Sequence, residues 1–359
     1  FQKQKILFMN DSIKKEADKI LKAKNPNIFG LRKDNFLDFI SDHNKWYVVV
    51  LCVALVFFAL HLINIPPLNF INIEETTLKT LINSRTTNIV TMISVTFAVI
   101  GFLIANLAIK ESFTYSLLFK KSTFFPVAFV ALSLIASFIL LSTLSDSLPI
   151  GYQKNALLVG SYLILVVIFL IGYLFTKLIR FTNQKYLLGL VRKELIKESN
   201  RNLLTIGRRI ISFNRVEKLG LFQYSMAFLK KMTKGDFTLP LGHNMISDIK
   251  INKLSKTIAA SKDINKVFIR NVYLNREIEN NEDGFFFVDE NDYPNFKQTL
   301  NELNNCIVTS KKSESLFTEA KEYVLQKLEE NIKSNDDKLV ESYLDMLFEV
   351  YRLQQKFKI

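Results

Sequence analysis

Residues 87–110 read TNIVTMISVTFAVIGFLIANLAIK, and this stretch decides the fold. As a helix rising ~1.5 Å per residue, its run of about 20 mainly apolar residues would cross the ~30 Å hydrocarbon core of a bilayer. Small and hydroxyl-bearing residues recur along it at alternating spacings of four and three, which places them on one helical face. They are Thr87, Thr91, Ser94, Ala98, Gly101, Ala105 and Ala108. In a membrane such a face either packs against another helix or lines a water-filled path. Asn106, the one amide deep in the span, requires a polar partner or water.

Three other apolar blocks resemble this one in length. The 359-residue chain is 49% hydrophobic, with 31 Phe and only 7 Pro and 11 Gly. The pattern predicts an α-helical membrane protein with four spans, at about 46–65, 87–109, 125–144 and 156–179. Lys and Arg are concentrated before the first span, between the second and third, and after the fourth. The positive-inside rule then predicts a multi-pass membrane protein with both termini cytoplasmic.

The polar parts of the chain divide by pattern into four segments. Residues 1–45 form an amphipathic cytosolic segment, in which Asp11 and Ser12 are candidate caps for a helix with a stripe at Ile13, Ala17, Ile20 and Leu21. Residues 29–40 within it are expected to pack on the cytosolic domain or to lie at the membrane interface. After the spans we expect three parts of an α+β cytosolic domain. They are a basic helical connector over 180–234, a small β-rich module over 235–292, and an acidic helical region over 293–359 with a hairpin at Asn335-Asp336.

Three stretches resemble a large family of bacterial predicted membrane proteins of unknown function. They are IANLAIKESFTYSLLFKKSTFF (104–125), SDIKINKLSKTIAASKDINKVFIRNVYL (247–274) with the following GFFFV, and LQKLEENIKSNDDKLVESYLDML (325–347). The resemblance implies four spans followed by a cytosolic region of a small β module plus helices, and it implies no particular chemistry. The Pro that this family usually has beside the Asn-Asp turn is absent here.

Motifs for catalysis or metal binding are not found in the sequence. The histidines, His43, His61 and His243, have no metal-ligand spacing, and the two cysteines, Cys52 and Cys306, lie far apart. The carboxylates between 279 and 292 lack the order of an EF-hand. No phosphate-binding loop, dinucleotide fingerprint or nucleophile elbow is present. We therefore predict that the chain is not an enzyme and has no metal or cofactor.

The charge is divided unevenly after the fourth span. Residues 180–276 carry 20 Lys and Arg against 6 Asp and Glu, whereas residues 277–359 carry 10 against 18. The basic segment could contact anionic lipid headgroups, bind an anionic ligand such as a nucleotide or oligonucleotide, or dock on the acidic segment. The candidate anion-binding residues are Arg201, Arg208, Arg209, Arg215, Lys230, Lys231, Lys253, Lys256 and Arg270.

Two functional hypotheses follow from these features. The first is a homo-oligomeric channel or pore-forming effector in the lipid bilayer of the bacterial inner (cytoplasmic) membrane, gated through its cytosolic domain by an anionic nucleotide or oligonucleotide signal. By analogy this arrangement resembles membrane effectors of bacterial anti-phage systems. The second is a non-conducting scaffold or sensor whose cytosolic domain binds a protein partner or anionic lipid. A secondary transporter is disfavoured, because the spans carry no charged side chain away from their ends.

Overall fold

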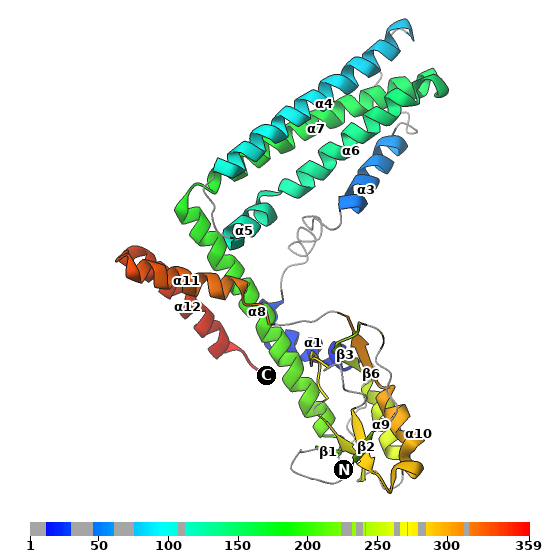
Figure 1. Cartoon of the computed structure of the whole chain (residues 1–359), viewed down its shortest axis with the longest axis vertical. Helices are drawn as coiled ribbons and strands as arrows, with labels where there is room; N and C mark the ends of the chain where they lie inside the picture. The colour runs from blue at the N-terminus through cyan, green and yellow to red at the C-terminus, as the bar shows by residue number, and fades with distance from the viewer. Residues whose placement is uncertain are drawn as a thin grey trace. The chain divides into compact units, whose positions relative to one another are not determined.

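The structure is a computed structural model, mostly helical, and its elements are labelled in Figure 1. It describes residues 12–29, 46–60, 75–106, 112–223, 232–234, 240, 242–261, 266–270, 272–278, 285–311 and 316–359. The chain divides into two compact units. The mixed unit comprises Phe1–Phe29 and Arg192–Ile359, and the helical unit comprises Gly30–Val191.

The helical unit is built from long apolar helices. Its elements are α3 (Trp46–Leu60), α4 (Glu75–Asn106), α5 (Ser112–Ser122), α6 (Phe124–Thr143), the 3₁₀ turn η4 (Ser145–Ser147) and α7 (Ile150–Arg180). By length and composition, α4, α6 and α7 could each cross a membrane. The 15 residues of α3 are apolar but give a helix of only about 22 Å. Residues 61–65, the end of the predicted first span, lie outside the described part of the chain.

Two of the long helices begin before the predicted spans. α4 starts at Glu75 rather than near residue 87, because Leu78 and Ile82 continue the apolar stripe and are buried. α7 starts at Ile150 rather than near residue 156. The helix predicted to continue beyond the fourth span is instead interrupted at residues 181–183, and α8 (Gln184–Glu217) follows.

Small residues on α6 and α7 allow helices of this unit to approach closely. Ser133 and Ser137 on α6 are fully buried, and the Ser133 hydroxyl donates to the Val50 carbonyl on α3 at 2.9 Å. A Cβ atom at Gly160 on α7 would lie 2.6 Å from Cε2 of Phe138. Serine and glycine at these positions let neighbouring helices pack closely, and the structure places them within the core of this bundle.

The mixed unit combines helices with two small sheets. Its elements are α1 (Ile13–Lys24), η1 (Pro26–Ile28), most of α8, β1 (Phe222–Gln223), β2 (Met232–Lys234), β3 (Met245–Ile249), α9 (Ile251–Ala260), β4 (Phe268–Ile269), β5 (Phe286–Asp289), α10 (Tyr293–Asn304), β6 (Ile307–Ser310), α11 (Glu319–Lys333) and α12 (Asp337–Lys356). One sheet has the order β1-β4-β5-β2, in which β1 and β4 are parallel and the other pairs antiparallel. The second sheet pairs β3 with β6 antiparallel.

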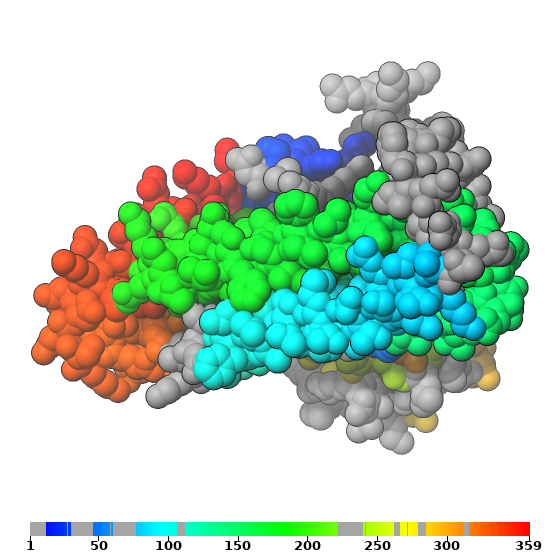
Figure 2. Space-filling view, turned by 90° about the horizontal axis from the view of Figure 1, so that it is seen from above, coloured from blue at the N-terminus to red at the C-terminus, as the bar shows by residue number. Residues whose placement is uncertain are grey.

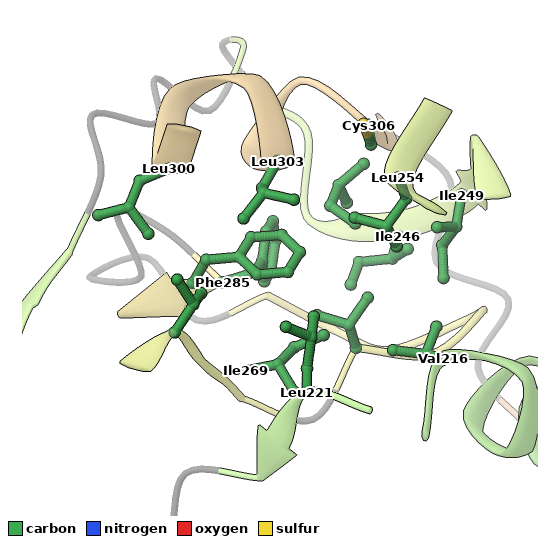
Figure 3. Packing of buried hydrophobic residues seen from close by; sticks show 14 of the residues in the cluster. Val216, Leu221, Ile246, Ile249, Leu254, Ile269, Phe285, Leu300, Leu303 and Cys306 are labelled. Carbon is green, nitrogen blue, oxygen red and sulfur yellow. The ribbon is translucent and has the colours of Figure 1, made fainter. Parts of the chain in front are cut away.

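An apolar core joins these sheets to α9 and α10. Leu254 of α9 and Leu300 and Leu303 of α10 pack with strand residues such as Ile246 and Ile269 (Figure 3). Because α9 supplies part of this core, the region predicted as a β-rich module, 235–292, contains a helix as well as strands, and the region 293–359 predicted as helical contributes the strand β6.

Two local features differ from the predicted pattern of this unit. α8 ends at Glu217 instead of continuing toward residue 234, and Gly220 follows in the left-handed conformation with a φ of +79°. Within the predicted β-rich module, only Met245–Ile249 of the run MISDIKIN is extended, and α9 begins at Ile251. Ile251 and Leu254 are buried three positions apart, which is helical spacing.

The N-terminal helix α1 belongs to the mixed unit. Ser12 is its N-cap, as predicted, and accepts a hydrogen bond from the Lys15 backbone N–H at 3.2 Å. Ile13, Ala17 and Leu21 form its buried stripe. The helix is therefore held by residues that lie at least 170 positions later in the sequence, within Arg192–Ile359.

The helices α11 and α12 form the predicted hairpin. Asn335 turns the chain with a φ of 53°, and the Asp336 carboxylate caps α12 by accepting from the Leu339 N–H at 3.2 Å. The start of α11 is fixed by Glu198 of α8, whose carboxylate accepts the N–H groups of Ala320 at 2.8 Å and Lys321 at 3.2 Å. Glu198 is thus a helix cap supplied from a distant part of the chain.

The environment of Glu198 perturbs its ionisation. Burial raises the pKa of this carboxyl above its ordinary value of 4.5, the nearby charges of Glu319 and Glu194 raise it further, and the two backbone N–H groups oppose the rise. The folded state therefore binds this proton more tightly than the unfolded state does. The contribution of Glu198 to stability is greatest below pH 4.5 and falls as the pH rises from there through the raised pKa.

We expect Glu198→Ala to lower the free energy of unfolding by about 1–3 kcal/mol, because it leaves two backbone donors at the start of α11 without an acceptor. Thermal unfolding of the purified chain measures this loss, with Glu341→Ala, an exposed carboxylate on α12, as the control. Glu198→Gln has a side chain that cannot ionise at this position. The free energy of unfolding of the wild type should exceed that of Glu198→Gln by less and less as the pH rises from about 4 to about 8. A pH-independent difference between these two proteins would contradict the assignment.

Candidate functional site

The candidate site lies on α4, whose surface is divided into three sectors. The first sector packs into the helical unit and consists almost entirely of isoleucine. Its buried members are Leu78, Ile82, Ile89, Ile93, Ile100 and Ile104. These residues recur at helical spacing, so they fix which side of α4 faces its own bundle.

The second sector carries the predicted small-residue stripe, and it is exposed. Thr87, Thr91, Ser94, Ala98, Gly101 and Ala105 are all exposed, and the side chain of Asn106 and the whole of Ala108 lie outside the described residues. A Cβ atom added at Gly101 would meet nothing within 4 Å. From the side shown in Figure 2, the blue-to-cyan surface of α4 lies open along its length. The burial of α4 against the other described residues therefore does not use the stripe.

The stripe is longer than the sequence analysis predicted. Thr80 and Ser84 are also exposed on α4 and continue the alternating spacing of four and three. They were missed because residues 66–86 were expected to form a loop, although the spacing itself could have revealed them. The exposed stripe now extends from Thr80 to Ala105, about seven helical turns.

The third sector consists of large apolar side chains. Val95, Val99 and Phe102 are exposed next to the stripe, with Phe102 at 69%. Exposed side chains of this size on an apolar helix are suited to contact with lipid tails. The stripe is thus bordered by a buried sector and by an apolar exposed sector.

Two hydroxyl groups of the stripe donate within α4 itself. The Thr87 hydroxyl donates to the Asn83 carbonyl at 3.1 Å and the Thr91 hydroxyl to the Thr87 carbonyl at 2.9 Å. Because these two donors are already satisfied, this part of the face can lie against another helix without leaving either O–H group unpaired. Its oxygen lone pairs still point outward and can accept hydrogen bonds from water.

The predicted anion-binding arginines on α8 have contacts inside the mixed unit. Arg208 pairs with Asp18 at 2.7 Å, and the Arg215 Nε donates to Glu16 at 2.9 Å. Both carboxylates lie on α1, so these ion pairs hold the N-terminal helix. Two further arginines stack on aromatic rings. Arg209 lies over Tyr273 at 5.2 Å from the ring centroid, and Arg201 lies over Phe317 at 5.4 Å.

The remaining basic candidates are spread over other elements. Lys253 and Lys256 are exposed on α9, and Arg270 follows β4 and is partly buried. Lys230 and Lys231 lie outside the described residues. The structure therefore distributes the described members of the predicted set over α8, α9 and a loop.

A pocket of about 420 Å³ between α8 and α12 was missed by the sequence analysis. Three basic side chains line it, together with an exposed aromatic ring: Arg192, Arg352, Lys356 and Phe348. Arg352 and Lys356 lie in the segment of net charge −8, so averaging over 277–359 concealed them. Spacing of four along α12 places Phe348, Arg352 and Lys356 on one face, and that signal was available.

Comparisons of the chain with protein-family models, with curated proteins and with solved structures found no match. The resemblance to bacterial predicted membrane proteins stays a prediction. Within the described ranges, no three His, Cys, Asp or Glu side chains come together as a metal site requires.

Proposed function

We propose that copies of this chain assemble in a bacterial inner membrane into a channel, with the stripe sectors of α4 facing one another around a shared path. The observation that carries this proposal is the exposure of the stripe from Thr80 to Ala105 while the isoleucine sector faces the chain's own bundle. The alternating spacing of four and three is that of a left-handed helical seam, so neighbouring α4 helices would cross at a shallow angle.

The composition of the mixed unit supports the proposed topology. Residues from before the first apolar block and after the last one fold together in this unit. A folded unit lies on one side of a bilayer, so the chain between those segments crosses an even number of times. Three described helices are long and apolar enough to cross. An even number is reached if the block at 46–65, which contains α3, provides the fourth span, with both termini cytoplasmic as the positive-inside rule predicts.

Gating in this proposal comes from the mixed unit. An anionic signal that binds this unit more tightly in one state than in the other would shift a closed–open equilibrium. Four spans enclose no wide aqueous path by themselves, so the path is shared among subunits. The membrane effectors of anti-phage systems offer an analogy for this arrangement.

The second candidate function is a non-conducting scaffold or sensor, and one observation favours it. Thr87 and Thr91 donate to their own helix, so this part of the face can form a dry contact between subunits. In that case α4 mediates assembly only, and the mixed unit binds a protein partner or anionic lipid.

Ion flux from proteoliposomes tests the proposal, with nucleotides or short single-stranded oligonucleotides added to the cytosolic side. For a channel we expect flux with an anion, and Ser94→Leu should reduce it roughly tenfold or more, because a ring of leucines closes a narrow path by dewetting. Val95→Leu is the matched control, since Val95 is adjacent in sequence and lies in the lipid-facing sector.

The mass of the assembly separates the two candidates. A stable oligomer in which Ser94→Leu removes flux and leaves the mass unchanged supports the channel. Loss of the oligomer in Ser94→Leu, with Val95→Leu intact, supports the dry packing face of the scaffold. A stable oligomer without flux under any of these conditions excludes the channel for those signals.

A further inference from the structure

The pocket between α8 and α12 has a defined set of charges. Arg192 comes from α8, whereas Asp345, Phe348, Glu349, Arg352, Leu353 and Lys356 come from α12. Its volume of about 420 Å³ is within the range of small-molecule sites, roughly 300–1,000 Å³. All its lining residues belong to the mixed unit.

One ion pair already occupies part of the pocket. The Arg192 Nε donates to the Glu349 carboxylate at 2.6 Å, and this contact raises the pKa of Arg192. Two other basic side chains, Arg352 and Lys356, are exposed, and no described carboxylate forms an ion pair with either. The pocket thus has two cationic groups available to an incoming anion and a third that is held by Glu349.

A flat apolar surface lies beside these cations. The Phe348 side chain is 58% exposed, although α12 belongs to a polar part of the chain. Its ring stacks on Tyr351 with an interplanar angle of 28°, and the Arg352 guanidinium lies 5.9 Å from its centroid. Leu353 adds a second apolar wall. An aromatic platform next to cations is suited to a ligand that carries both a planar ring and an anionic group.

We propose that this pocket binds a mononucleotide-like ligand, with the phosphate on Arg352 and Lys356 and the base on Phe348. Glu349 would compete with that phosphate for Arg192, so binding would weaken the ion pair that connects α8 to α12. The claim that this pocket receives the gating signal rests on the proposed function. The claim that it binds a ligand does not depend on conduction and is tested separately.

Calorimetric titration of the full chain in detergent with AMP tests the site. We expect AMP to bind, and Arg352→Ala and Lys356→Ala each to weaken binding roughly tenfold or more, because each removes a charge-assisted contact to phosphate. Phe348→Leu should weaken AMP binding and leave the binding of inorganic phosphate unchanged. Glu349→Gln should strengthen AMP binding, since it removes the competing carboxylate.

The matched control is Lys338→Ala, which removes one exposed positive charge from the same helix outside the pocket. Thermal unfolding of each variant verifies that it is folded, and Lys356→Gln replaces any alanine variant that is not. Equal weakening by Lys338→Ala, or equal affinity for AMP and inorganic phosphate with no effect of Phe348→Leu, would overturn the proposal. So would the absence of AMP binding. AMP binding without flux would retain the pocket and count against the channel alone.

Discussion

Gly160→Leu is expected to prevent the helical unit from folding. A Cβ atom at this position would lie 2.6 Å from Cε2 of Phe138, closer still to Cζ, and 3.1 Å from Cε2 of Phe57. Both rings are fully buried, with their centroids 5.7 Å apart, so neither can move aside without displacing α3 or α6. Overpacking of a core typically costs about 1–3 kcal/mol, and an entire isobutyl group at this junction should cost more than that.

The measurement is the yield of monodisperse protein and its thermal unfolding midpoint in detergent. Gly172→Leu on the same helix is the control, because a Cβ atom there would meet nothing within 4 Å. Phe138→Ala combined with Gly160→Leu should recover part of the loss by making room for the new side chain. If Gly160→Leu were as stable as Gly172→Leu, the close contact among α3, α6 and α7 would be wrong.

Reversing the charge of the two arginines that hold α1 is expected to release that helix. Arg208 and Arg215 face Asp18 and Glu16 across partly buried ion pairs. In Arg208→Glu/Arg215→Glu, both attractive contacts become repulsive ones. Exposed pairs contribute about 0.2–1 kcal/mol and buried ones considerably more, so we expect a combined loss of about 2–4 kcal/mol.

Limited proteolysis and thermal unfolding check this prediction, because a released α1 becomes a substrate for cleavage. The control is Lys193→Glu/Lys218→Glu, which makes the same change of charge at two exposed positions on α8 and just after it. Adding Glu16→Arg and Asp18→Arg to the first variant should restore most of the stability. Failure of that restoration, with the control stable, would show that these pairs do not hold α1.

The recurrence of apolar residues at helical spacing predicted the long helices of this protein, because burial of one side of a helix requires apolar residues at that spacing. The cap at Ser12 and the hairpin at Asn335 followed from local spacing and turn chemistry. The start of α4 was not predicted, because the many threonine and asparagine residues between positions 76 and 88 are typical of a loop. Only the buried Leu78 and Ile82 explain why that stretch is helical.

The candidate sites were less accessible to sequence reasoning, since they depend on which side of an element is already occupied. Spacing placed the α4 stripe on one face, but it could not distinguish contacts within the chain from an exposed surface. The same ambiguity affected α6, whose serines are buried. Net charge predicted an anion site on α8, yet Arg208 and Arg215 pair with α1, a partner nearly 200 residues earlier. The pocket at Arg352 combines α8 and α12, which no local pattern connects.

The position of α1 determines when the mixed unit can be completed during protein synthesis. A ribosome produces this helix before the apolar helices of the helical unit, whereas its partner Asp248 is made 234 residues after Lys14. The Asn25 side chain bonds to the backbone of Lys358, 333 residues later, at 2.7 Å. Translation at about 5–20 residues per second therefore leaves α1 without these contacts for tens of seconds, while the helical unit is synthesised. Completion of the mixed unit is thus necessarily a late step, and it follows the synthesis of all three described helices that are long and apolar enough to cross a membrane.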